Sequence, residues 1–208
     1  MTEAEWLASD DPLRMLQQVQ ADPNARKTLL LTAACLCRVW RALPKYCRGW
    51  TELAEEVAEG RAHPKRLDED YEAVEMFLAS YDNDGRCYAV VNLTSVGWND
   101  PGAWDSKKRS WRAERKAQVS LVRDIFGNPF RPVALDPAWR TPTVTALATA
   151  AYEERILPSG NLDTQRLAIL ADALEDAGCG DAEMLTHLRG DGPHVRGCWV
   201  VDLLLGKE

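Results

Sequence analysis

Apolar residues recur at helical spacing along most of the chain. The clearest case is residues 24–43, where apolar side chains repeat at intervals of three and four. Because apolar residues also occur off that face, we expect this helix to be buried on most sides. The same reasoning predicts further helices over residues 2–8, 12–21, 51–60, 68–81, 106–126, 142–154, 164–177, 182–189 and 194–205.

Capping residues and prolines mark where several of these helices begin and end. Asp11-Pro12 and Thr141-Pro142 each place a capping side chain before a proline that suits the first helical turn. Thr2 and Glu5 have the spacing of a capping box, and Gly178 suits a left-handed C-terminal cap. The sequence therefore predicts a mainly α fold, as a single multi-helix domain.

A turn-forming stretch, Pro158 to Asn161, suggests an internal boundary. We predict a helical domain over residues 1–157 and a C-terminal helical hairpin-like subregion over residues 158–208, packed on the first. Residues 82–105 stay ambiguous, because Tyr88, Val90 and Val91 favour a strand whereas the flanking patterns favour helix.

Composition and charge narrow the class of protein. The 208 residues are 46% hydrophobic and 27% charged, as in an ordinary globular domain. The net charge of -7 argues against a dedicated nucleic-acid binder but leaves room for a local basic patch. The first residues are acidic, unlike a secretory signal, and the longest apolar stretch is too short to span a membrane. We expect no membrane association, a cytoplasmic location and reduced thiols.

Two cysteines and two histidines near the C-terminus form a candidate metal site: Cys179, His187, His194 and Cys198. This set of donors suits tetrahedral zinc. If the last helix begins at His194, then His194 and Cys198 lie one turn apart on one face. A structural zinc would then tie two helices across the turn at residues 190–193.

Two other interpretations of these residues stay open, because no C-x-x-C pair is present. The thiols of Cys179 and Cys198 could be buried packing groups beside hydrogen-bonded histidines. Alternatively, Cys198 and His194 could form a reactive thiolate–imidazole pair. Among the other cysteines, Cys35, Cys37 and Cys47 are expected to pack in the core.

A basic stretch provides a second candidate site. Its side chains could contact nucleic-acid phosphates, and they are Lys107, Lys108, Arg109, Arg112, Arg115 and Lys116. The alternative is a solvated helix face that pairs with the abundant acidic residues of the chain.

No glycine-rich phosphate loop, G-x-S-x-G or H-E-x-x-H motif occurs, so no catalytic residue is assigned. Eight tryptophans suggest either an aromatic core or a surface for a partner. The leading hypothesis is a non-catalytic protein-interaction or scaffold protein whose partner is another protein. The alternatives are a nucleic-acid-associated accessory protein that uses residues 107–123, and a metal- or Cys-dependent enzyme centred on Cys198.

Three stretches of the sequence resemble a family of planctomycete bacterial proteins. They are MTEAEWLASDDPLRML at residues 1–16, LVRDIFGNPFRPVALDPAW at residues 121–139, and residues 167–208, which end in GPHVRGCWVVDLLLGKE. The resemblance implies a bacterial intracellular protein from a lineage-expanded family. It brings no known activity, substrate or catalytic residue.

Overall fold

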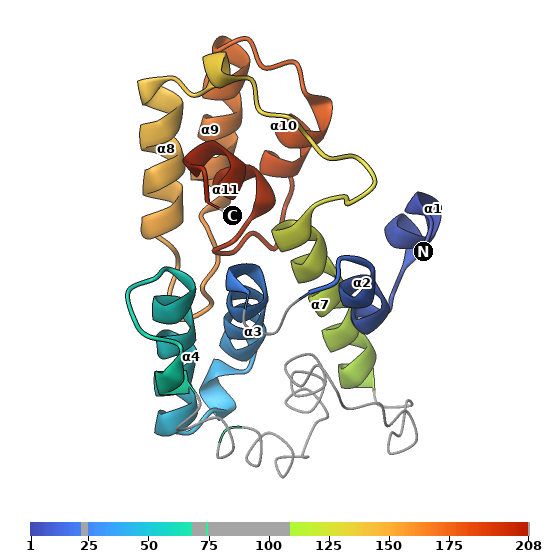
Figure 1. Cartoon of the computed structure of the whole chain (residues 1–208), viewed down its shortest axis with the longest axis vertical. Helices are drawn as coiled ribbons and strands as arrows, with labels where there is room; N and C mark the ends of the chain where they lie inside the picture. Colours follow the sequence, from blue (N-terminus) through green and yellow to red (C-terminus); the bar gives the residue numbers. More distant parts are fainter. Residues whose placement is uncertain (22–24, 68–73, 75–108, 208) are drawn as a thin grey trace. The chain divides into compact units, whose positions relative to one another are not determined.

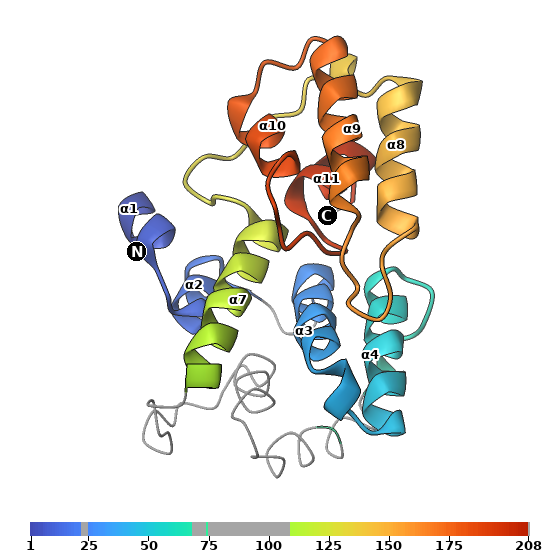
Figure 2. The same ribbon diagram turned by 180° about the vertical axis from the view of Figure 1, so that it is seen from behind.

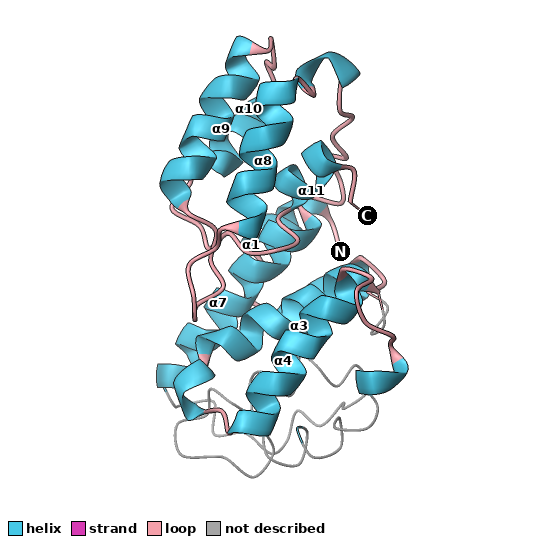
Figure 3. Ribbon diagram, turned by 90° about the vertical axis from the view of Figure 1, so that its left-hand side faces the viewer, coloured by secondary structure: helices cyan, strands magenta, loops and turns pink. Residues whose placement is uncertain are grey.

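The computed structural model describes residues 1–21, 25–67, 74 and 109–207. Over these residues the predicted mainly α fold is confirmed: the regular elements are helices and none is a strand (Figure 3). Two isolated bridges join Ile156 to Asn161 and Asn161 to Val195. The chain divides into two compact units, Met1–Val122 and Arg123–Glu208, and each is described by itself.

The first unit contains α1 (Glu3–Ala8), α2 (Pro12–Gln18), α3 (Arg26–Arg38), the 3-10 turn η1 (Trp40–Ala42), α4 (Lys45–Ala58) and most of α7 (Arg109–Phe126). Helices α3 and α4 pack side by side (Figure 1). The predicted caps are confirmed, because the Thr2 and Glu5 side chains bond each other's backbone amides and Asp11 accepts from two amides of α2.

Two helix limits in this unit differ from the prediction. Helix α3 ends at Arg38, and the tighter turn η1 replaces its expected last turn. Helix α4 begins at Lys45 rather than near Thr51, because Pro44 provides the extended residue from which a helix can start. The helix expected over residues 68–81 and the ambiguous residues 82–105 lie outside the described part, apart from the helical residue Val74.

The described cysteines of the first unit mostly lie in its core, as predicted, and so do two of its tryptophans. Cys35 and Cys47 are fully buried, whereas Cys37 is half-buried. Trp6 is buried, and the buried Trp50 donates from its indole nitrogen to the Leu67 carbonyl.

The second unit contains the last turn of α7, η2 (Pro137–Trp139), α8 (Pro142–Glu153), α9 (Thr164–Asp176), α10 (Ala182–Leu188) and α11 (Trp199–Leu205). Helix α9 packs against α8 and α10, and α11 packs against the same two helices (Figure 2). Tyr152, Leu170 and Leu188 are among the side chains buried between them. This unit includes the predicted subregion 158–208 and also residues 123–157.

The last helix begins at Trp199, and the prediction that it starts at His194 is wrong. Residues 194–198 form a turn instead, in which Gly197 has a φ of +91° and the Cys198 amide donates to the Val195 carbonyl. His194 and Cys198 therefore do not share a helix. No described helix has both the length and the apolar character of a membrane span.

Candidate metal centre

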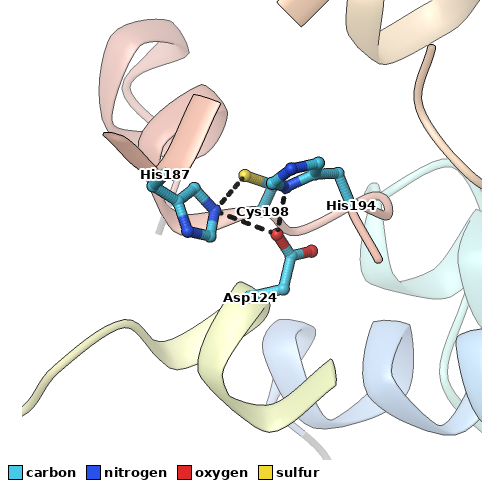
Figure 4. Close-up of side chains that lie close together, drawn as sticks. All are labelled: Asp124, His187, His194 and Cys198. Atoms are coloured by element: carbon cyan, nitrogen blue, oxygen red, sulfur yellow. Dashed lines mark hydrogen bonds and ion pairs between the residues drawn. The ribbon is translucent and has the colours of Figure 1, made fainter. Parts of the chain in front are cut away.

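Three of the four predicted ligands come together in the second unit, and an aspartate joins them. One side-chain atom each of Asp124, His187, His194 and Cys198 lies within 4.8 Å of all the others (Figure 4). Asp124 comes from the last turn of α7 and His187 from the last turn of α10. His194 lies in the loop that follows α10, and Cys198 is the N-cap residue of α11.

The carboxylate of Asp124 contacts both histidines of this cluster. Its Oδ1 lies 3.0 Å from Nε2 of His187 and 2.9 Å from Nδ1 of His194. Its Oδ2 accepts the Val195 backbone N–H at 2.9 Å, which fixes the orientation of the carboxylate. Burial has the largest single effect on the pKa of Asp124 and by itself would raise it. The hydrogen bonds and charges of both histidines together outweigh burial, so the pKa of Asp124 is lowered.

The two nitrogens of His194 have different partners. Nε2 lies 3.2 Å from the Gly190 carbonyl, so this nitrogen must carry a proton and donate it. In the neutral ring Nδ1 then holds a lone pair, and it faces the Asp124 oxygen at 2.9 Å. Two acceptors at this distance need a cation between them, which is either a second proton or a metal ion.

The surroundings of His194 raise its pKa and therefore favour a positive charge on the ring. Burial is the largest influence and opposes protonation, but the hydrogen bond and charge of Asp124 raise the pKa, together with the Gly190 carbonyl. The position between Nδ1 and the carboxylate is therefore attractive to a cation.

His187 uses one nitrogen for two contacts. Its Nε2 lies 3.0 Å from Asp124 Oδ1 and 3.3 Å from Sγ of Cys198. In a nucleophile–imidazole–carboxylate triad, by contrast, the nucleophile and the carboxylate contact different ring nitrogens. Convergence of single donor atoms on one point is the arrangement of metal ligands.

The cluster is almost closed to solvent. Asp124, His194 and Cys198 are 2%, 3% and 0% exposed, whereas the His187 side chain is 20% exposed. Burial, aided by the charge of Asp124, raises the pKa of the Cys198 thiol well above its usual value. A thiolate at this position therefore needs a cation beside it.

Trp199 packs beside His187, the most exposed member of the cluster. Its ring centroid lies 5.4 Å from that of His187. Trp199 approaches the chain closely at Gly127, where an added Cβ would lie 3.2 Å from the indole ring.

Comparison with known proteins finds no matching family model, no matching curated protein and no matching solved structure. The resemblance to planctomycete proteins stays a prediction, and the function is inferred from the site itself.

Cys179, the fourth predicted ligand, is not part of the cluster. It follows α9 and is buried in the apolar core of the second unit, where burial raises the pKa of its thiol. Asp124 joins the three other residues in its place. The sequence contains one sign of this role: Asp124 is an acid beside the apolar residues Leu121, Val122 and Ile125.

The predicted basic site is described only in part. Lys107 and Lys108 lie outside the described residues, and of Arg109 and Arg112 only the helical backbone is described. Arg115 forms an ion pair with Asp11 at 2.7 Å, and Lys116 is exposed. The contact of Arg115 is of the kind expected for a helix face that pairs with acids, and the nucleic-acid interface stays a prediction.

Helix α7 also carries a buried acid that pairs with a basic residue. Glu114 lies on the same helix and accepts two hydrogen bonds from Arg38, at 2.8 and 3.1 Å. Arg38 belongs to a second basic stretch of the sequence, with Arg41, Lys45 and Arg48. A described member of each basic stretch is therefore paired with an acid of the first unit.

Proposed function

We propose that this protein binds one structural zinc ion through Asp124, His187, His194 and Cys198, and that the zinc-stabilised unit serves a non-catalytic protein-interaction or scaffold role. The observation that carries the proposal is the convergence of one oxygen, two nitrogens and one sulfur within 4.8 Å. These atoms come from the end of α7 and from three positions within residues 187–198, and three of the four residues are almost fully buried.

The spacing of the donor atoms is close to that of a tetrahedral zinc site. Zinc bonds of about 2.0–2.3 Å place neighbouring ligand atoms roughly 3.3–3.7 Å apart. The contacts of 2.9, 3.0 and 3.3 Å in the cluster need a small expansion to reach this range, and the widest separation, up to 4.8 Å, has to close by about 1 Å. The sulfur and nitrogen donors favour zinc over magnesium or calcium, which prefer oxygen.

Charge balance supports the same ion. The carboxylate of Asp124 and the thiolate of Cys198 together neutralise a divalent cation, so the loaded site buries no net charge. A histidine that binds a metal through one ring nitrogen commonly donates the N–H of its other ring nitrogen to a carbonyl oxygen. His194 makes this contact with Gly190, and Asp124 is held by the Val195 amide.

A structural role is better supported than a catalytic one. Four protein ligands fill all four tetrahedral positions, whereas catalytic zinc keeps one position for water or substrate. The alternative of an enzyme centred on Cys198 has less support, because the thiol is fully buried and its histidine partner contacts Asp124 through the same nitrogen.

Native mass spectrometry of the full chain, purified under reducing conditions without chelator, tests the metal. We expect one zinc per chain, lost in Cys198→Ser and in His194→Ala together with a lower thermal midpoint. Cys179→Ser is the matched control, since this cysteine is buried in the same unit but lies outside the cluster. An unaltered chain without metal, or equal loss of metal in Cys179→Ser, would contradict the proposal.

The interaction role is tested separately. A pull-down from the native host should return a partner in stoichiometric amount, and the zinc-free Cys198→Ser variant should recover less of it. Failure to recover any stoichiometric partner would count against this role while leaving the zinc site intact.

A further inference from the structure

The loop between His187 and Cys198 contacts the proposed metal ligands through its backbone. The Gly190 carbonyl accepts from Nε2 of His194, and the Val195 amide donates to Oδ2 of Asp124. The conformation of this loop therefore determines where two of the four ligands point. Because backbone atoms make both of these contacts, the contacts depend mainly on the φ and ψ angles of the loop.

Gly192 is a residue of this loop at which a side chain would displace its neighbours. Its φ is +83°, in the left-handed region that disfavours a side chain. A Cβ at this position would lie 2.8 Å from the backbone nitrogen of His194 and 3.2 Å from Cδ2 of its ring. The first distance is too short for two unbonded heavy atoms, so His194 would have to move.

We propose that Gly192 is a positioning residue of the metal site, which sets the direction of His194 Nδ1 through the lack of a side chain. This inference rests on the proposed zinc site and deepens it. Gly192 is itself exposed, so a methyl group there removes no core packing and acts on the site through His194. Its replacement should rotate or shift the imidazole, and Nδ1 should no longer meet the other three donor atoms.

Gly178 provides a matched control. Its φ of +87° is almost the same, but a Cβ there would meet nothing within 4 Å. Gly178→Ala and Gly192→Ala therefore both place a side chain at a positive φ in the same unit, and only the second crowds a ligand. Gly192 also precedes Pro193, which restricts its backbone further. Gly192→Asn is a further variant, since asparagine tolerates the left-handed region and keeps the Cβ contact. It is used if Gly192→Ala does not fold.

Titration of the full chain with Co²⁺ provides the test, because the absorption of Co²⁺ reports both its thiolate bond and its coordination geometry. We expect Gly192→Ala to bind Co²⁺ on the order of 10- to 100-fold more weakly, as when outer contacts of metal ligands are lost. Its thiolate charge-transfer band should remain, and its ligand-field bands should change. Gly178→Ala should match the unaltered chain in affinity and in spectrum, even where it melts earlier.

The outcomes separate this inference from the proposal on which it rests. If the unaltered chain binds neither Co²⁺ nor Zn²⁺, the zinc site is wrong and the role of Gly192 falls with it. If the unaltered chain binds metal and Gly192→Ala has the same affinity and spectrum, only the positioning role is wrong. Equal weakening in Gly178→Ala would also overturn it, because general strain would then explain the effect.

Discussion

Asp124 is unfavourable where it stands unless it has a partner of positive charge. It lies in the last turn of α7, where the helix dipole disfavours a carboxylate, and it is almost fully buried. Two histidines and the Val195 amide surround it. Since both the helix dipole and burial disfavour a carboxylate here, we expect Asp124 to belong to a binding site rather than to stabilise the fold.

The first prediction at this scale concerns the charge of Asp124. Asp124→Asn keeps the size of the side chain and an acceptor for the Val195 amide but removes the negative charge. We expect loss of the zinc and a fall in the free energy of unfolding of about 3–5 kcal/mol, as when one member of a buried charged group is removed. Metal content and denaturant unfolding of the same preparation measure the two effects.

The control for this variant is Asp172→Asn. Asp172 is mostly exposed and pairs with Arg189 at the surface, so we expect a change of less than about 1 kcal/mol and full zinc content. Asp124→Asn with full zinc content would show that the carboxylate is not a ligand.

The sequence predicts the three proposed ligands that lie close together along the chain and misses the fourth, which is distant in sequence. His187, His194 and Cys198 are close in sequence and of residue types that bind metals, so their grouping follows from spacing and chemistry. Asp124 is 63 residues from His187, and only the tertiary packing of α7 brings the two together. Cys179 fits the chemistry equally well, but the end of α9 places it in the apolar core.

At the scale of elements, local signals predict the start of a helix where a capping side chain precedes it. Thr2, Asp11, Thr141, Asp163 and Asp181 cap their helices because each side chain bonds amides that immediately follow it. The last helix does not begin at His194, because the His194 carbonyl, which in a helix would accept from the Cys198 amide, accepts from the Leu162 amide. The Cys198 amide donates to the Val195 carbonyl in a turn instead, and the Val195 amide bonds Asp124.

The cap of α10 yields the second prediction. The Asp181 carboxylate accepts from the Met184 amide at 2.9 Å and holds the start of a seven-residue helix whose last turn carries a proposed ligand, His187. Asp181→Ala should cost about 0.5–2 kcal/mol of stability. Because so short a helix frays readily, we also expect weaker zinc binding, measured by competition with a chelator.

A second capping aspartate separates the two effects. Asp163 caps α9, which carries none of the four ligands. Asp163→Ala should therefore cost similar stability and leave the zinc affinity unchanged. Equal loss of affinity in both variants would mean that general destabilisation, and not the position of His187, weakens the site.

At the scale of the whole molecule, the two compact units have different means of stabilisation. The first unit buries a run of apolar residues along α3 and has a partly buried ion pair between Arg38 and Glu114. The second unit has an apolar core among α8, α9, α10 and α11, and all four proposed ligands lie within its limits. A metal bound there stabilises the folded form of this unit by mass action.

Metal removal should therefore affect the two units unequally. After treatment of the full chain with a chelator, we expect faster amide hydrogen exchange at Asp202 and Leu204 in α11 and little change at Leu30 and Leu31 in α3. All four of these residues are almost fully buried, so exposure alone would not distinguish them. Zinc at about 100 times its dissociation constant contributes roughly 2.7 kcal/mol, which corresponds to about a 100-fold change in exchange through unfolding of the second unit. The Cys198→Ser chain should already show the fast exchange and should not respond to the chelator. Uniform acceleration in α3 and α11 would instead mean that the two units unfold together, and that the ion stabilises the chain as a whole.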